Sequence, residues 1–336
     1  QLGPVGDRLS RSALLCPPWR IYNLAWQREV NQLLIDVADN IEVTLITQAV
    51  NSRQTAKNVM GNLYAMLDTQ GAENLCERFK GYPAIVVAAG PSVEDDLPHL
   101  LPPDRGNHIL IACLPMLKPL LQRGIVPNFC AALDYHEISA RFLEDLPPEA
   151  AHVHYLYEVK VNPAVVKATP PEAKMSLLTY DWADALLELP FPSRGALPPA
   201  GTVAHLAFHL AQYLGCDPII LSGLDLSFTD KYYPECLLKA HPWKGTNETI
   251  LQNLLDRGGF RQVEGNDGQL CYTDPQMLCY LMQFEQVIKT APQKIVDCSG
   301  GVKKYAVKNR DTLAGAIALY CDKIVDAPCF NYDWVR

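Results

Sequence analysis

The sequence predicts an α/β protein of the Rossmann-like class, with a mostly parallel sheet covered by helices on both faces and a helical segment in front of it. Short, continuous apolar runs such as 82–89 are typical of strands that are buried on both faces. Segments with helical apolar spacing separate these runs, which indicates successive βαβ units. Since 49% of the residues are hydrophobic and 20% charged, the chain can bury a sizeable core.

The elements follow one another in a regular order. Residues 1 to about 80 are expected to be helical, with helical apolar spacing over 26–46 and a helix-compatible stretch over 51–66. The predicted strands are 82–89, 108–113, 129–133, 151–157, 175–180, 218–222 and 294–298. The predicted helices that alternate with them or follow them are 114–123, 201–214, 275–289 and 312–320. The polar segment 226–268 shows no clear periodicity, and a loop of that length is usually functional or mobile.

This order suggests three parts. A helical lead-in segment occupies 1–78, a Rossmann-like nucleotide-binding catalytic domain 79–305, and a helical tail 306–336. The chain begins with Gln1 and not with Met, which leaves open whether a leading segment precedes it.

Composition narrows the class of function and the compartment. A formal net charge of −8 argues against a general binder of nucleic acid or of anionic membranes. No apolar stretch reaches the roughly 18–20 residues of a membrane span, and no secretory signal is present. The 11 cysteines are odd in number, form no CxxC pair and lie largely in apolar runs. We therefore expect reduced thiols and a cytoplasmic protein.

The first predicted strand ends in a turn suited to a phosphate. In an open parallel sheet, ligands bind beyond the carboxyl ends of the strands. Gly90-Pro91-Ser92 stands at such an end, where glycine allows close backbone approach and serine offers a hydroxyl. The alternative is a tight turn with an N-capping serine, because the motif is neither a GxGxxG nor a Walker loop.

Two other strands end in carboxylates, and a helix begins at a Gly-Thr pair. Asp134 can bind a ribose hydroxyl, a base edge or a metal ion, or it can simply cap a helix. Gly223 and Asp225 follow a later strand and can orient a loop or a ligand hydroxyl. Gly201-Thr202 is a candidate for a second anion site, or it is an ordinary helix start.

The remaining candidates lie on the strongest helix and in the long polar segment. His205 and His209 are four residues apart and could in principle hold zinc, but no HExxH glutamate accompanies them, so core packing is favoured and no metal site is predicted. Tyr232 and Tyr233 can neutralise a leaving phosphate, and His241 can act as a general base. The alternative for these three is a lid packed by its own aromatic rings.

Several motifs together resemble a known family. They are Ala88-Ala89-Gly90-Pro91-Ser92, Gly124-Ile125-Val126-Pro127-Asn128 before Leu133-Asp134, Gly201-Thr202-Val203, Leu214-Gly215-Cys216, the stretch 219–226, Tyr272-Thr273-Asp274, and Asp297-Cys298-Ser299-Gly300-Gly301. In this order the sequence resembles the bacterial motility-associated-factor proteins over roughly residues 50 to 305. That family is linked to flagellin glycosylation with nonulosonic acids, and its central domain is similar to bacterial sialyltransferases that use a CMP-activated sugar.

The resemblance implies roles for individual residues. Gly90 and Ser92 would contact the CMP, Thr202 would lie beside it, and Tyr232 or Tyr233 would assist the leaving phosphate. The sialyltransferase base is a histidine shortly before the Thr-Asp pair, and the corresponding stretch 268–272 contains none. His241 or a carboxylate such as Asp267 can take its place, or the chain is not a sialyltransferase.

Three functions therefore stay open. The first is a metal-independent glycosyltransferase that moves a nonulosonic sugar from a CMP-activated donor to a protein hydroxyl, with flagellin as an acceptor that rests on the resemblance alone. The second comes from a further resemblance, to the 6-hydroxymethylpterin diphosphokinase (MptE-like) domain family, and requires ATP and Mg²⁺ held by carboxylates such as Asp134 and Asp225. The third is a nucleotide-binding protein without catalysis.

Overall fold

The computed structural model describes residues 30, 49–101, 107–178, 194, 195 and 197–321. Its centre is an eight-stranded sheet in the order β10-β9-β6-β1-β2-β3-β4-β5, and every neighbouring pair of strands is parallel. The strands are β1 (Ala84–Val87), β2 (Ile109–Cys113), β3 (Phe129–Ala132), β4 (His154–Glu158), β5 (Met175–Leu178), β6 (Ile219–Ser222), β9 (Ile295–Asp297) and β10 (Asn309–Arg310). The predicted Rossmann-like α/β class is confirmed.

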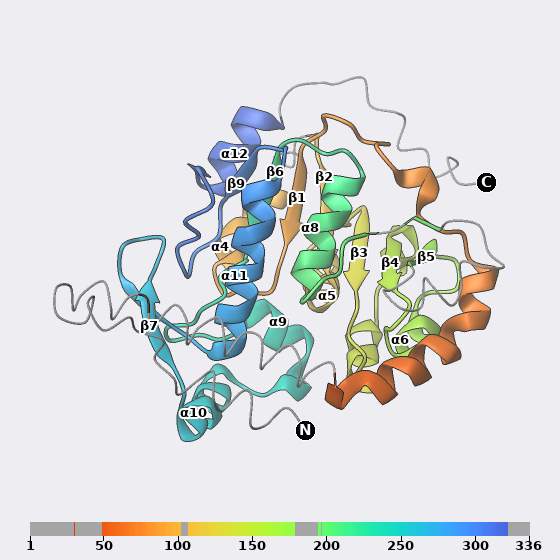
Figure 1. Cartoon of the computed structure of the whole chain (residues 1–336), viewed down its shortest axis with the longest axis horizontal. Helices are drawn as coiled ribbons and strands as arrows, with labels where there is room; N and C mark the ends of the chain where they lie inside the picture. Colours follow the sequence, from red (N-terminus) through yellow and green to blue (C-terminus); the bar gives the residue numbers. More distant parts are fainter. Residues whose placement is uncertain (1–29, 31–48, 102–106, 179–193, 196, 322–336) are drawn as a thin grey trace, which may run out of the picture.

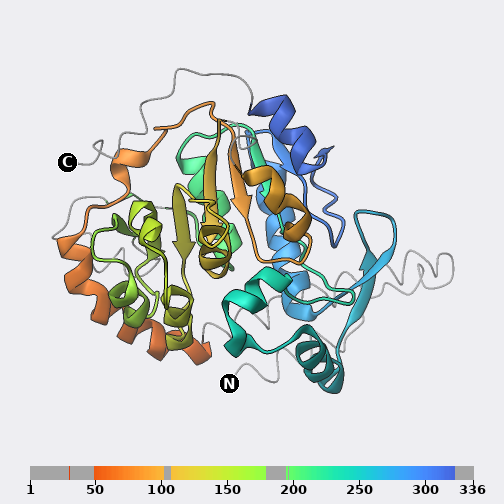
Figure 2. The same ribbon diagram turned by 180° about the vertical axis from the view of Figure 1, so that it is seen from behind.

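Helices cover both faces of this sheet, as the two opposite views show (Figures 1 and 2). The α-helices are α4 (Val93–Asp96), α5 (Leu114–Leu121), α6 (Pro163–Ala168), α8 (Val203–Tyr213), α9 (Glu235–Ala240), α10 (Asn247–Arg257), α11 (Pro275–Thr290) and α12 (Leu313–Tyr320). Short 3₁₀ helices connect them, namely η1 (Glu73–Leu75), η2 (Leu97–Leu100), η3 (Glu137–Leu143), η4 (Pro148–His152) and η5 (Pro242–Lys244). Helices α8 and α11 lie in front of the sheet in Figure 1, and α4 and α5 lie on the other face.

Strand β1 shows why its run of apolar residues is continuous. Successive side chains of a strand point to opposite faces. Ala84 and Val86 pack in the core cluster of α8 and α11, whereas Ile85 and Val87 pack in the cluster of α5, α9 and α12. Both faces of β1 are buried in apolar clusters, so no polar residue alternates with the apolar ones along the strand.

A long helix over residues 49–68 covers the β3 and β4 end of the sheet. Its Val59 and Met66 are buried in the same cluster as Tyr155 and Tyr157 of β4. Its Asn62 side chain donates hydrogen bonds of 2.9 and 2.7 Å to two backbone carbonyls after β4. This helix belongs to the predicted lead-in segment; the predicted helical stretch 26–46 lies outside the described residues apart from residue 30.

The structure differs from the prediction in two regions. The segment 226–268 contains α9, α10 and strand β7 (Arg261–Glu264), which forms an antiparallel hairpin with β8 (Leu270–Thr273). Beyond residue 305, β10 pairs with β9, and α12 packs in the core cluster of β1 and β9. Among the described residues, no helix is long and apolar enough to cross a lipid bilayer.

The chain order creates a switch point beside β1. From β1 the chain moves outward through β2, β3, β4 and β5, then returns to form β6 on the other side of β1. Strands β1 and β3 point toward the lower side of Figure 1, where α9 and α10 lie. In open parallel sheets, ligands bind at such a switch point, beyond the carboxyl ends of the strands.

Candidate functional site

The loops after β1 and β6 meet at the switch point. Ser92 donates its backbone N–H to Asp225 Oδ2 at 2.8 Å and its hydroxyl to Asp225 Oδ1 at 2.5 Å. The loop after β9 joins them, because the Gly300 N–H donates to Ser92 Oγ at 2.9 Å. Asp225 is only 4% exposed, and burial, the largest influence, raises its pKa. Asp225 and the Ser92 hydroxyl therefore hold the three loops together. Both carboxylate oxygens of Asp225 accept a hydrogen bond, and the Ser92 hydroxyl both donates one and accepts one.

Two glycines make this close approach possible. A Cβ on Gly90 would lie 2.5 Å from Asp225 Cγ, and one on Gly223 would lie 2.5 Å from the Ala88 carbonyl oxygen. Gly223 also has a φ of 65°, in the left-handed region that side chains rarely adopt. Both positions are limited to glycine by packing between the β1 and β6 loops. The approach to a phosphate predicted for Gly90 stays a prediction.

Asp134 and His136 lie after β3. The Asp134 carboxylate accepts the His136 N–H at 3.0 Å and the Ser139 hydroxyl at 2.5 Å, so it organises its own loop. The His136 side chain is exposed, and its ring lies 4.2 Å from that of Tyr135. All eight histidines are among the described residues, and His136 is the exposed one that follows the carboxyl end of a strand. No role was predicted for His136 from the sequence, although its place just after the predicted strand 129–133 was an available signal.

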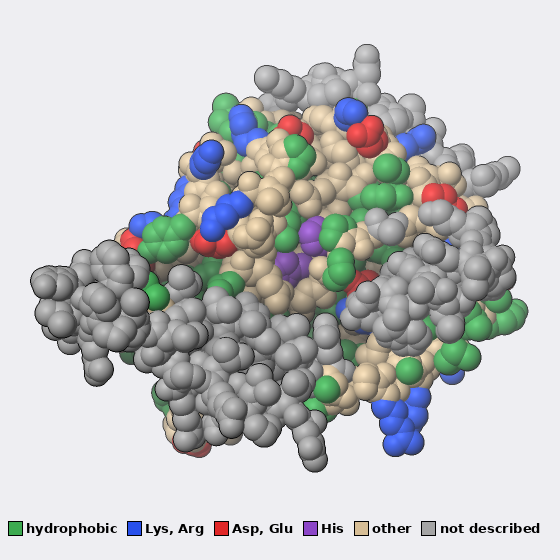
Figure 3. Space-filling model, viewed as in Figure 1, with side chains coloured by type: hydrophobic (Ala, Val, Ile, Leu, Met, Phe, Trp, Pro, Cys, Tyr) green, Lys and Arg blue, Asp and Glu red, His purple; other side chains and the backbone are tan. Residues whose placement is uncertain are grey.

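Thr202 begins helix α8. Its hydroxyl oxygen accepts the His205 N–H at 3.2 Å and lies 2.9 Å from His205 Nδ1. The His205 ring stacks on Phe284 of α11 at 3.7 Å, and burial lowers its pKa to about 3. A Cβ on the preceding Gly201 would lie 2.2 Å from Gln283 Oε1, again on α11. Both α8 histidines are buried, as the packing interpretation expects, and histidine side chains gather over α8 at the centre of this face (Figure 3).

Tyr232 and Tyr233 are held at the start of α9 by one side chain. Asn247 Oδ1 accepts both of their backbone N–H groups, at 2.9 and 3.0 Å, and its amide donates to the Tyr233 carbonyl. A tyrosine phenol is protonated at neutral pH and can donate a hydrogen bond, and burial raises the pKa of both of these phenols further. After burial, the neighbouring Tyr233, Asp274 and Tyr280 also raise the pKa of Tyr232.

Further phenols belong to the same neighbourhood. Burial is the main reason why the pKa of Tyr280 on α11 is raised, and Asp274 and Tyr135 also act on it. Asp274 caps α11 by accepting the Met277 N–H at 2.7 Å. Tyr135, Tyr232 and Tyr280 thus come from the β3 loop, the β6 loop and α11 to one region at the carboxyl edge. Tyr135 and Tyr280 had no predicted role, because nothing in their local sequence indicates that these distant segments meet.

His241 is placed differently from its expected role. Its side chain is 1% exposed and packs edge-on against Phe142 with ring centres 4.9 Å apart. Burial, followed by the charge of Lys118, lowers its pKa to about 4. A backbone hydrogen bond with Pro115, at the start of α5, opposes that shift. In this position the buried ring packs between α5 and η5, and its role as a general base stays a prediction.

Asp134 and Asp225 do not lie close enough together to ligate the same Mg²⁺ ion. Asp134 follows β3 and Asp225 follows β6, and β1 and β2 lie between these two strands. Three strand spacings separate them by roughly 14 Å, whereas ligands of one Mg²⁺ ion must lie within about 2.1 Å of it. Within the part of the chain that the structure describes, no group of three His, Cys, Asp or Glu side chains could hold a metal ion.

Comparison with protein-family models agrees with this architecture. The model described as 6-hydroxymethylpterin diphosphokinase MptE-like matches residues 57–231, more than half of the chain, from the long helix to the loop after β6. The chain belongs to this family. The matched range of the MptE-like chain includes the Gly90–Ser92 loop, Asp134, Thr202 and Asp225.

The fold of the MptE-like chain is similar to that of a solved enzyme, the MAf glycosyltransferase from Magnetospirillum magneticum AMB-1. The TM-score is 0.54 at 20% sequence identity, and the match covers 73% of this chain and 34% of that enzyme. The MptE-like chain thus spans about a third of its structural relative, and the likeness concerns the fold. A comparison with curated proteins gave no match.

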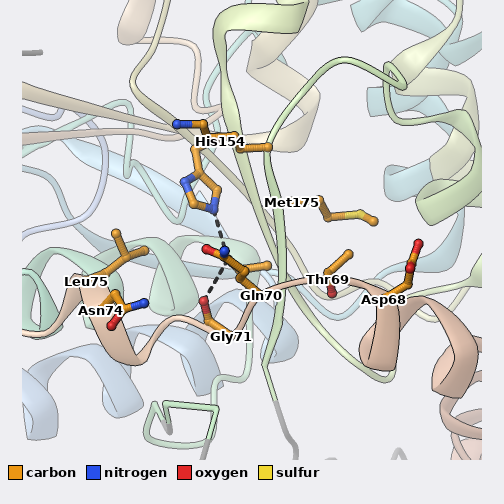
Figure 4. Close-up of a pocket in the computed structure, with 10 residues that line it drawn as sticks. Asp68, Thr69, Gln70, Gly71, Asn74, Leu75, His154 and Met175 are labelled. Carbon is orange, nitrogen blue, oxygen red and sulfur yellow. Dashed lines mark hydrogen bonds between the residues drawn. The ribbon is translucent and has the colours of Figure 1, made fainter. Parts of the chain in front are cut away.

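A separate cavity lies at the opposite edge of the sheet. It has a volume of about 250 Å³ and is lined by residues 68–71, Asn74, Leu75, His154 and 174–176. His154 Nε2 lies 2.9 Å from Ser176 Oγ, which donates to the Gly71 carbonyl at 3.2 Å (Figure 4). His154 and Met175 begin β4 and β5. The cavity therefore lies at the amino ends of the strands, away from the switch point.

Proposed function

We propose that this chain is a cytoplasmic glycosyltransferase that moves a nonulosonic sugar from a CMP-activated donor to a protein hydroxyl, such as a flagellin serine or threonine. The carrying observation is that the phenol groups of Tyr135, Tyr232 and Tyr280 come from three separate segments to one region at the carboxyl edge of the sheet. Neutral hydroxyl groups of this kind can stabilise a departing phosphate without a metal ion. The fold shared with a MAf glycosyltransferase supports the same class of reaction.

The nucleotide of the donor lies across the carboxyl ends of β1 and β6 in this proposal. Gly90 and Pro91 present backbone there, while Ser92, Gly223 and Asp225 keep the two loops in register through the bonds described above. Thr202 lies at the start of α8, whose N-terminal dipole favours an anion. Asp134 holds the loop that carries His136.

His136 is the base in this proposal, and it replaces the buried His241. Its exposed imidazole takes the proton of the acceptor hydroxyl while the acceptor oxygen forms a bond to the anomeric carbon. The bond from that carbon to the phosphate oxygen breaks, and CMP leaves with the electron pair. Hydrogen bonds from Tyr232 and its neighbours stabilise the charge on the leaving phosphate.

The second candidate is a 6-hydroxymethylpterin diphosphokinase, which the family description favours. It requires Mg²⁺ at the phosphates of ATP. Asp134 and Asp225 are separated by two strands, and each carboxylate already accepts two hydrogen bonds. In this candidate, Asp134 and Asp225 therefore cannot share one Mg²⁺ ion, and a single carboxylate would hold the metal together with the ATP phosphates.

Thermal stability separates the two candidates. A ligand that binds the folded state at about 100 times its dissociation constant stabilises that state by about 2.7 kcal/mol, so the melting temperature rises. We expect stabilisation by CMP that is unchanged by a chelator, and little by ATP with Mg²⁺. Stabilisation by ATP only in the presence of Mg²⁺ would favour the diphosphokinase instead.

The role of His136 has its own test. The variant His136→Ala should bind CMP as the wild type does but transfer sugar roughly 10²- to 10⁴-fold more slowly, because only the base is lost. The control is His152→Ala, since His152 is exposed at the opposite edge before β4. Equal transfer rates for both variants would remove His136 from the mechanism.

A further inference from the structure

Among the described residues, the ammonium group of Lys244, at the end of η5, has no hydrogen-bonding partner. Its Nζ lies over three aromatic rings, 4.7 Å from the centre of Trp243, 5.1 Å from Phe142 and 5.7 Å from Tyr233. Aromatic faces attract a cation, but they leave its three N–H donors without acceptors. Within the described part of the chain, no carboxylate lies within ion-pair distance of this Nζ and no oxygen accepts from it.

Four lysines on segments that follow strands of the sheet form ion pairs. The pairs are Lys118 with Asp145 at 4.0 Å, Lys160 with Glu158 at 2.6 Å, Lys231 with Glu94 at 3.8 Å and Lys304 with Asp297 at 3.1 Å. Lys244 differs from these four lysines, since aromatic rings and not a carboxylate hold its positive charge in place.

The surroundings of Lys244 place it at the carboxyl edge of the sheet. Burial lowers its pKa, which the Asp134 carboxylate after β3 opposes. That carboxylate accepts hydrogen bonds from the His136 N–H and the Ser139 hydroxyl. Tyr233, below the ammonium, packs against the same core cluster as Ala89, the residue before Gly90. Lys244 therefore faces the region between the ends of β3 and β1.

Neighbouring atoms of the same segment are also unsatisfied. Trp243 Nε1 and His241 Nε2 are buried and have no hydrogen-bond partner among the described residues. Buried polar groups are normally satisfied by protein, water or ligand, so these two atoms could accept or donate to a ligand beside Lys244. Partial burial also strengthens the attraction of the Lys244 charge for an anion, because less water screens it.

We infer that Lys244 is the cation of a phosphate subsite, which takes the phosphate group of the nucleotide donor. This inference rests on the proposed function for the identity of the nucleotide. The rings of Phe142, Tyr233 and Trp243 hold the ammonium in position, and its three N–H donors bind the phosphate oxygens. The ring of Tyr232 lies 4.8 Å from that of Tyr233, so its phenol can bind the same phosphate group as it leaves.

The test compares ligands with and without phosphate on three variants. Lys244→Met keeps an apolar stem against the rings and removes the charge, Lys244→Arg keeps the charge, and Lys239→Met removes an exposed charge from α9 as a control. Calorimetric titration with CMP, cytidine and inorganic diphosphate measures each affinity. Melting temperatures without ligand establish that the variants are folded.

We expect Lys244→Met to weaken binding of CMP and diphosphate about 10- to 100-fold and to leave cytidine binding unchanged, as the loss of charge-assisted hydrogen bonds predicts. Lys244→Arg and Lys239→Met should bind CMP nearly as the wild type does. Equal CMP affinities for Lys244→Met and Lys239→Met would overturn the subsite and leave the proposed function standing. Diphosphate binding that depends on Lys244, without any CMP binding, would instead retain the subsite and reject the CMP donor.

Discussion

At the scale of single residues, the switch point is built on buried carboxylates. Asp96 at the end of α4 is 7% exposed, and its Oδ2 accepts the hydroxyl of Ser222, the last residue of β6, at 2.6 Å. Burial raises the pKa of Asp96 to about 7; the Ser222 hydrogen bond opposes this shift, and the carboxylates of Asp225, Asp95 and Asp297 add to it. The folded protein therefore holds a proton on Asp96 that the unfolded chain releases near pH 3.8.

This proton makes stability depend on pH with a definite sign. Because the folded pKa of Asp96 lies above the unfolded value, its contribution to the free energy of unfolding falls as pH rises from about 4 to about 7. Asp96→Asn removes the titrating group, so the variant should gain stability relative to wild type across that range, by up to about 4 kcal/mol. Urea unfolding of both proteins at about pH 5 and about pH 8 measures the difference. Parallel pH profiles would contradict the raised pKa.

The site could be predicted from sequence only in part at this scale. The Gly90–Ser92 turn, Asp134 and Asp225 were all visible as residues that follow apolar runs. Their hydrogen-bond partners could not be predicted, because Ser92 and Asp225 are 133 residues apart and Ser92 and Gly300 are 208 residues apart. Tertiary pairing decides whether such a polar group faces a ligand or another loop.

At the scale of elements, helix α8 fixes one side of the site through its first residue. Thr202 caps the helix by accepting the His205 N–H, and α8 then buries Leu206, Phe208 and Leu210 in the core cluster of α11 and β1. An N-cap threonine typically stabilises a protein by about 1 kcal/mol over alanine. The cap and the helix packing therefore place the start of α8 at the carboxyl edge.

Replacing Thr202 tests this assignment. Thr202→Ala should lower the free energy of unfolding by about 1 kcal/mol, and Thr202→Ser should lower it by less than half of that amount, because serine keeps the capping oxygen. Chemical denaturation of the two variants and the wild type gives the comparison. If serine were as destabilising as alanine, packing of the threonine methyl group and not the cap would be its role.

Helices and strands were predictable where their patterns are long or continuous. The buried strands and helices α8 and α11 follow directly from apolar runs and helical spacing. The 226–268 segment was not predictable, because α9 has only six residues, α10 has only Asn247 buried, and β7 is half exposed. Such elements have weak hydrophobic patterns and depend on contacts such as Glu94 with the Cys236 N–H at 2.9 Å.

At the scale of the whole molecule, the predicted tail packs onto the sheet. Leu313 of α12 is 1% exposed and lies in the cluster that contains Val87 and Val296. Strand β10 extends the sheet at β9 by parallel pairing. We therefore expect the described C-terminal residues to unfold together with the sheet.

A cavity-creating substitution in α12 tests whether this helix and the sheet unfold in a single transition. Leu313→Ala should lower the free energy of unfolding by about 2 to 5 kcal/mol while the protein keeps a single transition. The matched control is Leu319→Ala on the same helix, since Leu319 is 58% exposed and its replacement should change stability by less than about 0.5 kcal/mol. An early partial transition in the Leu313 variant would show an independent tail.

The most direct test of the central claim is the release of CMP from a CMP-activated nonulosonic acid. The purified protein is incubated with this donor, an acceptor carrying serine or threonine hydroxyls, and a chelator, and the CMP and the sugar–acceptor product are quantified together. We expect CMP and product to form in equal amounts despite the chelator, and His136→Ala to slow both by roughly 10²-fold or more. No CMP release by the wild type, together with diphosphate transfer from ATP and Mg²⁺ to a pterin alcohol, would contradict it.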